Sequence, residues 1–319
     1  RHSQIRIAVT KLHLGLTPWN FSDLSAPSLC SQAQFAEQCG YQSLWLPENH
    51  FGANALPDPL TLLAAVAGAT QTIKLGTTSY LLTLRNPLQA AEQVAVFDQM
   101  CGGRLILGVG RGYAPEMLRA FHVPVAEKRK IFAWTLGIMR RAWAGEPVTL
   151  DDDPEHAIEV YPRPLQQPHP PIWVAAFGPK ALAQAGGFGL PYLSSPMESM
   201  ATLGHNYAQH QAAAEAAGVT PPTELPLMRT VFVSRDAQQC KKLKAMLGAE
   251  TGNARLQEGE TVDDWTIIGE PEFVRERVRM YQENLGMTHM IATRIRVSGL
   301  AEPLLRDSVA LLAETLDGL

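Results

Sequence analysis

A polar triplet follows a short apolar run near residue 45, and its side chains could exchange protons. Glu48, Asn49 and His50 come directly after residues 43–47, which are apolar enough to form a buried strand. A carboxylate, a carboxamide and an imidazole at one strand end offer an acid, a hydrogen-bonding group and a base. In a parallel α/β barrel, catalytic residues lie at the carboxyl ends of the strands. The triplet is therefore the first candidate site for acid–base chemistry.

A second strand end could bind an anion. Residues 104–109 are predicted as a strand, which runs into Gly110-Arg111-Gly112, a glycine turn around one permanent cation. Glycines let a ligand approach the backbone, and a guanidinium fork matches the geometry of a phosphate. Further along, Phe177-Gly178-Pro179 precedes a predicted helix, whose first N–H groups are unpaired and attract anions. Together these features predict a phosphorylated ligand close to the acid–base groups.

Strand-like and helix-like segments alternate along the whole chain. The predicted strands are residues 5–9, 43–46, 73–79, 104–109, 172–176, 192–194, 227–234 and 289–293. This alternation is typical of a parallel sheet, and 319 residues suit one closed barrel. No GxGxxG follows the first predicted strand, which disfavours a Rossmann fold. We therefore predict an α/β fold, a (β/α)8 TIM barrel that forms a single domain over residues 1–319.

Two polar stretches exceed what a minimal barrel requires. Residues 148–167, after the fourth helix, are predicted as a hairpin with a proline-rich connector. Residues 247–265, after the seventh strand, are glycine-bearing and weakly periodic. Long loops on compact domains are often lids. The second stretch is thus either a lid over the barrel mouth or a disordered decoration.

Composition argues against several function classes. The net charge is -4, the basic residues are scattered and no apolar stretch could span a bilayer, so neither nucleic acid nor membrane is an expected partner. No signal peptide is visible, and the four cysteines form no CxxC pair, which favours a cytoplasmic protein with reduced thiols. Asp151-Asp152-Asp153 lacks accompanying ligand spacing, so no metal site is predicted.

These motifs resemble those of the bacterial luciferase-like flavin monooxygenase family. The segments that carry the resemblance are WLPENHF at 45–51, LGTTSYLLTLRNPLQAAEQVAVFDQMCGGRLILGVGRGY at 75–113, Phe121, Lys128-Arg129, PPIWV at 170–174, GPKAL at 178–182 and IGEP at 268–271. Each is modest alone, but their order and spacing make the resemblance specific over most of the chain. It implies a TIM barrel that binds a flavin. The flavin is usually reduced FMN from a separate reductase, and less often the deazaflavin F420.

The resemblance also implies particular cofactor contacts. Arg111 and Arg129 match positions that bind the flavin phosphate. The isoalloxazine ring is expected against a non-proline cis peptide between Thr78 and Ser79, with the Ser79 hydroxyl near the reactive edge of the ring. The remaining expected cofactor contacts are Gly110, Phe177, Gly178 and Pro179.

The polar triplet departs from the family at one position. The family commonly has an acidic residue followed by two histidines, and in bacterial luciferase the first histidine is linked to catalysis. Here that position is Asn49, which can hold an oxygen by hydrogen bonding but cannot exchange a proton near neutral pH. The proton role therefore passes to His50, to water or to no group. Glu48 is predicted either to orient its neighbours or to make a hydrogen bond inside the barrel.

The sequence thus predicts an FMN-dependent monooxygenase. The resemblance implies that reduced FMN (FMNH2) and O2 oxygenate a small organic substrate through a C4a-peroxyflavin. Trp19, Phe21 and Phe51 favour an apolar substrate, and small residues at 60–69 and 87–97 predict a homodimer. Two alternatives remain open: an F420-dependent oxidoreductase on the same fold, and a non-catalytic flavin-binding protein. Weaker site candidates are Glu92, Gln93, Arg294 and Arg296.

Overall fold

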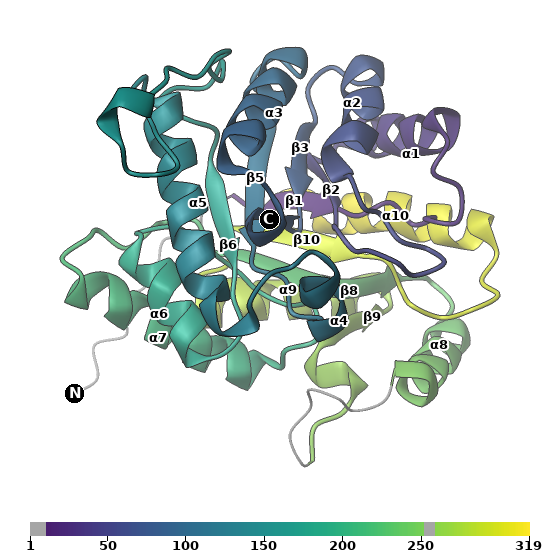
Figure 1. The fold of residues 1–319 in the computed structure, drawn as a ribbon. Coiled ribbons are helices and arrows are strands. Elements are labelled where there is room, and N and C mark those ends of the chain that lie inside the picture. The colour runs from purple at the N-terminus through teal and green to yellow at the C-terminus, as the bar shows by residue number, and fades with distance from the viewer. Residues whose placement is uncertain (1–10, 252–258) are drawn as a thin grey trace. The chain divides into compact units, whose positions relative to one another are not determined.

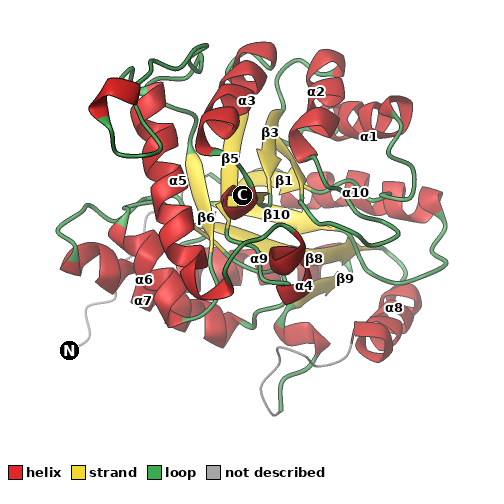
Figure 2. Cartoon of the chain, viewed as in Figure 1, coloured by secondary structure: helices red, strands yellow, loops and turns green. Residues whose placement is uncertain are grey.

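The computed structural model of the protein describes residues 11–251 and 259–319, in which parallel strands alternate with helices (Figures 1 and 2). Contacts group these residues into two compact units. Unit 1 contains residues 11–21, Phe35–Leu44 and Ala176–Leu319, and unit 2 contains Ser22–Gln34 and Trp45–Ala175. The helix α1 (Ala26–Gln38) and the strand β2 (Ser43–Leu46) include residues of both units. A single domain over the whole chain stays a prediction.

Unit 1 is built on a parallel sheet whose strands lie in the order β1, β10, β8, β9. These strands are β1 (His13–Leu16), β8 (Pro226–Val233), β9 (Thr266–Gly269) and β10 (His289–Thr293). Every residue of β8 is buried, as expected for a parallel sheet that is covered on both faces. Helices α8 and α9 pack on β9, and α10 packs on β8. The other elements of this unit are β7 (Tyr192–Leu193), α6 (Pro179–Gly187), α7 (Met200–Ala216), α8 (Ala237–Thr251), η4 (Val262–Asp264), α9 (Pro271–Leu285) and α10 (Glu302–Leu316).

Unit 2 contains a second group of parallel strands around two tryptophans. These strands are β3 (Lys74–Thr77), β4 (Tyr80–Leu81), β5 (Leu105–Gly110) and β6 (Ile172–Ala175), and β5 pairs with each of the other three. The Trp45 ring stacks on Trp173 at 4.9 Å and lies so close to Gly76 that an added Cβ would be 2.2 Å from it. Only glycine leaves room for this ring. The helices are α2 (Pro59–Ala69), α3 (Pro87–Met100), α4 (Pro115–Ala120) and α5 (Lys128–Trp143), with 3-10 turns η1 (Leu82–Leu84), η2 (Val125–Glu127) and η3 (Pro154–His156).

The predicted strands agree with the observed ones except in three places. The strand predicted at 5–9 lies outside the described residues, and the strand that pairs with β2 and β10 is β1. The strand predicted at 73–79 ends at Thr77, and a separate short strand, β4, follows. β9 was not predicted, because this strand (TIIG) is short, has only two isoleucines as large apolar residues and directly follows a long polar stretch. The α/β alternation itself is confirmed.

The two predicted insertions have partly defined structures. Val148 and Ile158 form an antiparallel bridge, which confirms a hairpin in residues 148–167. Of the stretch 247–265, residues 252–258 lie outside the described residues, α8 occupies its start and η4 lies near its end. A lid in this stretch stays a prediction. Among the described residues, no helix is both long and apolar enough to cross a bilayer.

A stacked histidine pair in unit 1 makes stability depend on pH. His13 and His289 lie in register on β1 and β10, with imidazole centroids 4.4 Å apart. Burial, and then the charge of His13, lower the pKa of His289 from 6.5 to about 4. The unfolded chain binds a proton on His289 more tightly than the folded protein does. The stabilising contribution of neutral His289 is therefore complete above pH ~6.5 and is lost as the pH falls toward ~4.

We expect the free energy of unfolding to fall by at most about 3 kcal/mol between these two pH values through His289. The variant His289→Gln should therefore show a flatter dependence of stability on pH. Urea unfolding at several pH values from about 7.5 to 5 measures this, with wild type as the reference. An identical pH dependence in the variant and the wild type would contradict the role of His289.

Candidate functional site

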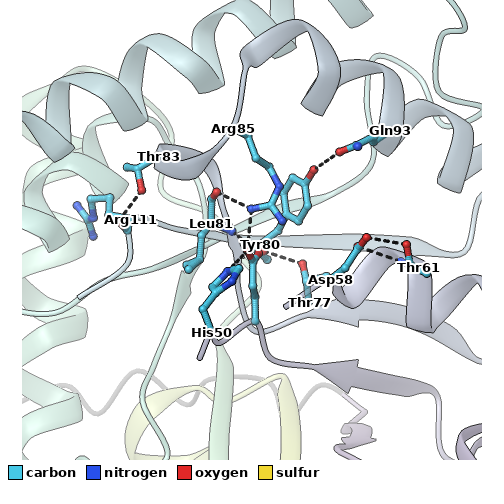
Figure 3. A network of polar contacts seen from close by, with 12 residues as sticks. His50, Asp58, Thr61, Thr77, Tyr80, Leu81, Thr83, Arg85, Gln93 and Arg111 are labelled. Atoms are coloured by element: carbon cyan, nitrogen blue, oxygen red, sulfur yellow. Dashed lines mark hydrogen bonds and ion pairs between the residues drawn. The ribbon is translucent and has the colours of Figure 1, made fainter. Parts of the chain in front are cut away.

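The Glu48 carboxylate is the centre of a buried polar network in unit 2. Figure 3 labels its partners His50, Leu81 and Arg85. Its side chain is 0% exposed and accepts three hydrogen bonds. His50 Nε2 and Arg85 Nη1 each lie 2.9 Å from Oε1, and the Leu81 backbone N–H donates to Oε2 at 2.9 Å. A buried charge is costly unless it is paired and hydrogen-bonded, and these donors meet that requirement. Glu48 makes both the contact with His50 and internal hydrogen bonds with Leu81 and Arg85, so both roles predicted for it are compatible with the geometry and stay predictions.

The segment after β3 brings Arg85 and Leu81 to Glu48. β4 pairs with β5, and η1 turns the chain so that Arg85 comes back over the preceding residues. Arg85 Nη1 also donates to the Leu81 carbonyl at 2.7 Å, and its guanidinium lies 3.7 Å from the Tyr80 ring centroid. Sequence reasoning missed Arg85. The available signal was a cation directly after the largely apolar run LLTL.

Tyr80 is a neutral neighbour of this network. Its hydroxyl donates to Gln93 Oε1 at 3.0 Å. Burial raises the pKa of Tyr80 to about 12, against the opposing effect of the Arg85 charge. The phenol therefore carries no charge at neutral pH. Gln93, a weaker candidate in the sequence, is thus connected to Glu48 through Tyr80 and Arg85.

The His50 imidazole lies between the buried carboxylate and an aromatic pair. Its side chain is 10% exposed, and its ring meets Phe121 edge-on at 4.9 Å. Phe51, which is 69% exposed and has a positive φ of 69°, stacks on Phe121 at 5.6 Å. Because a carboxylate only accepts hydrogen bonds, Nε2 carries the proton that points to Glu48. In the neutral ring, Nδ1 is then the nitrogen with the lone pair.

Asn49 has a local structural partner. It is exposed, its Oδ1 accepts from the Leu56 backbone N–H at 2.8 Å, and its own N–H donates to the Leu56 carbonyl at 3.1 Å. The carboxamide therefore closes the loop of residues 49–56. A catalytic role for Asn49 stays a prediction, and this geometry favours a structural role.

Asn49→Ala should lower stability by about 1 kcal/mol, because an exposed site loses one hydrogen bond to the backbone. Asn49→Asp keeps an acceptor oxygen at the same place and should lose less. The midpoint of urea unfolding for the two variants measures the difference. A larger loss for Asn49→Asp than for Asn49→Ala would contradict the loop-closing role.

Three cations gather at the end of β5. Arg111 is only 6% exposed and donates from Nη2 to the Ala175 carbonyl at 3.1 Å. Burial, and then the charge of Arg129, lower the pKa of Arg111 to about 10. Burial also lowers the pKa of Lys128, as do Arg111 and Arg129, and its Nζ lies 3.5 Å from the Gly112 carbonyl. These mutually repelling cations would be stabilised by an anion. Lys128 is part of the motif but was not predicted as a site residue.

Residues predicted from two different strands meet beside these cations. The Thr78–Ser79 peptide is cis, as predicted. Ser79 packs against Gly110 so closely that a Cβ added at Gly110 would lie 2.1 Å from Ser79 Oγ. The Thr83 hydroxyl donates to the Arg111 carbonyl at 2.8 Å. Residues 79–85 therefore touch both the end of β5 and the Glu48 network.

The remaining candidates lie in unit 1, apart from the acidic run at 151–153 and Glu92, which is exposed on α3 of unit 2. Gly178 has a φ of 78° and caps α6, Pro179 occupies the first turn of that helix, and Phe177 is 45% exposed. Arg294 lies 4.8 Å above the Phe21 ring, and burial lowers its pKa. Arg294 and Trp19 help to line a cavity of ≈ 30 Å³. Within the described part of the chain, no group of three or more acidic, His or Cys residues is placed to hold a metal ion.

The chain matches one known protein family over most of its length. The sequence profile of the family described as Luciferase-like monooxygenase matches residues 24–289. The chain therefore belongs to the luciferase-like monooxygenase family, whose members are oxidoreductases.

Individual relatives and solved structures agree with this assignment. Uncharacterized protein y4vJ of Sinorhizobium fredii is 32% identical over 71% of this chain and 64% of its own length. An F420-dependent glucose-6-phosphate dehydrogenase of Beutenbergia cavernae is 28% identical over 82% of this chain and 86% of its own length. The chain thus spans less than two thirds of the first of these relatives.

The structural matches cover nearly the whole chain. Monooxygenase RslO1 from Streptomyces bottropensis has a TM-score of 0.80 and 25% identity, covering 96% of this chain and 98% of that one. The oxygenating constituent of 3,6-diketocamphane monooxygenase from Pseudomonas putida, solved with FMN, has a TM-score of 0.79 and 19% identity with the same coverage. These matches confirm the predicted fold class, an α/β TIM-barrel-like fold.

Proposed function

We propose that the protein is a flavin-dependent monooxygenase that uses reduced FMN and O2 to oxygenate a small organic substrate. The observation that carries this proposal is the cluster of Arg111, Lys128 and Arg129 at the end of β5, beside the contact between Ser79 and Gly110. A buried arginine with further cations next to it matches the charge and oxygen geometry of a phosphate. Membership of the luciferase-like monooxygenase family supports the same conclusion.

The residues of unit 2 suit a phosphorylated flavin. Arg111, Lys128 and Arg129 would hold the phosphate, and Ser79 and Gly110 would border the flat ring, because no side chain at position 110 fits against Ser79. Thr78 belongs to the same edge. Within unit 1, Phe177, Gly178 and Pro179 at the start of α6 stay predicted cofactor contacts, because a helix N-terminus attracts anions.

The bound flavin would supply two electrons to O2, so that one oxygen atom enters the substrate and the other leaves as water. The protein would contribute orientation and exclusion of water. His50 Nδ1 would accept or return a proton beside the reacting atoms, with Glu48 holding the ring. A separate reductase would supply the reduced flavin, and the working form would be a cytoplasmic homodimer.

Ligand titration followed by oxygen uptake tests this function. FMN, riboflavin and F420 are each titrated into the protein, and binding is measured by fluorescence. The protein with reduced FMN is then supplied with O2 and a panel of apolar aldehydes, ketones and phenols. We expect FMN to bind most tightly and at least one substrate to yield an oxygenated product. Tight binding of F420 with weak binding of FMN would overturn the proposal in favour of a hydride-transfer enzyme.

A further inference from the structure

The hydrogen bonds around Glu48 form a relay from Arg85 to His50. Both residues donate to the same carboxylate oxygen, Oε1, at 2.9 Å, and the Leu81 N–H holds the other oxygen. The His50 and Arg85 side chains are 10% and 16% exposed, so little water competes with these contacts. Electrostatic interactions between such groups are stronger than on the surface.

Arg85 is held in place independently of His50. Its Nη1 donates to the Leu81 carbonyl at 2.7 Å and its guanidinium lies on the Tyr80 ring. Its charge therefore remains beside Glu48 whichever way the imidazole turns. The arrangement is that of a base oriented by a carboxylate, with a third group that fixes the carboxylate.

We propose that Arg85 is a positioning residue that acts through Glu48 to set the tautomer and the proton affinity of His50. Glu48 keeps the proton of the neutral imidazole on Nε2 and stabilises the imidazolium, while the positive charge of Arg85 limits that stabilisation. Nδ1 is thereby available to accept a proton. The catalytic use of this nitrogen rests on the proposed monooxygenase function, whereas the relay itself does not.

The charges near His50 predict in which direction each substitution changes the protonation of the imidazole. Glu48 and Arg85 carry opposite charges, and Tyr80, the next titratable group in the network, stays neutral near pH 7. The aromatic neighbours Phe51 and Phe121 carry no charge. Removing the Glu48 charge should make His50 harder to protonate, and removing the Arg85 charge should make it easier. A merely structural role would not produce shifts of opposite direction.

NMR titration of the histidine side chains measures the relay directly, with His50→Gln used to assign the His50 signal. We expect Glu48→Gln and Arg85→Gln to move the titration midpoint of His50 in opposite directions relative to the wild type, downward in the first variant and upward in the second. Arg85→Lys should restore most of the wild-type midpoint. The matched control Arg141→Gln, which removes an exposed guanidinium paired with Glu146, should leave the midpoint unchanged.

Shifts of the same direction in Glu48→Gln and Arg85→Gln, or no shift in either, would overturn the relay. If Glu48→Gln does not fold by circular dichroism, the comparison of Arg85→Gln with Arg85→Lys still decides the matter, because only the former lacks a cation. FMN binding is measured on the same samples. If the wild type does not bind FMN, the proposed function is refuted, whereas the result for His50 stays valid.

Discussion

Replacing Arg111 by alanine is expected to weaken FMN binding by about 1.5–3 kcal/mol, or roughly ten- to a hundredfold in Kd. Arg111 is only 6% exposed, so water would compete little with its charge-assisted hydrogen bonds to a phosphate and their loss should be costly. Fluorescence titration with FMN measures the loss.

Riboflavin, which lacks the phosphate, separates phosphate binding from a general effect on the pocket. Arg111→Ala should change the Kd for riboflavin much less than the Kd for FMN. Arg111→Lys should keep part of the affinity, because it keeps the charge but not the two-pronged geometry. Arg141→Ala is the surface control and should bind FMN like the wild type. Equal losses for FMN and riboflavin would show that Arg111 does not contact the phosphate.

Replacing His50 by glutamine should lower turnover by about 10²–10⁴-fold, the range for loss of a general acid–base group. Glutamine keeps the size and polarity of the side chain and can still hydrogen-bond to Glu48, but it cannot exchange a proton. FMN affinity should stay within about twofold of wild type, since no cation of the phosphate cluster is altered. Oxygen uptake with a substrate found in the panel measures the effect.

The matched control for this substitution is His156→Gln. His156 is an exposed histidine that is paired with Asp151 in the hairpin of residues 148–167. Its replacement should leave both turnover and FMN binding unchanged. If His50→Gln retains full turnover, the polar triplet is structural and the proton-transferring group lies elsewhere.

Much of the candidate site follows from local sequence patterns. Glu48, Arg111 and Gly178 were predictable because each directly follows an apolar run, and the end of a buried strand is where side chains reach a common edge. The cis peptide at Thr78–Ser79 followed from the family resemblance. The alternation of strands and helices followed from periodicity, which depends on few long-range contacts.

The partners of these residues could not be predicted in the same way. Arg85 lies 37 positions from Glu48, and only the turn through β4 and η1 brings the two together. Lys128 contributes to the cation cluster because α5 starts next to the end of β5, which is a tertiary relation. The Asn49 carboxamide has its partner at Leu56, seven residues away, across an irregular loop. Such contacts depend on chain geometry that residue types alone do not specify.

The short segment of residues 79–85 has a consequence for redesign. Ser79 presses on Gly110, Thr83 holds the Arg111 carbonyl, and Arg85 holds Glu48. One stretch of backbone thus serves both the part of the protein assigned to cofactor recognition and the part assigned to proton handling. A substitution in this stretch should therefore affect cofactor recognition and proton handling together. Variants selected for another cofactor should also change in pH optimum, unless residues 79–85 are left unaltered.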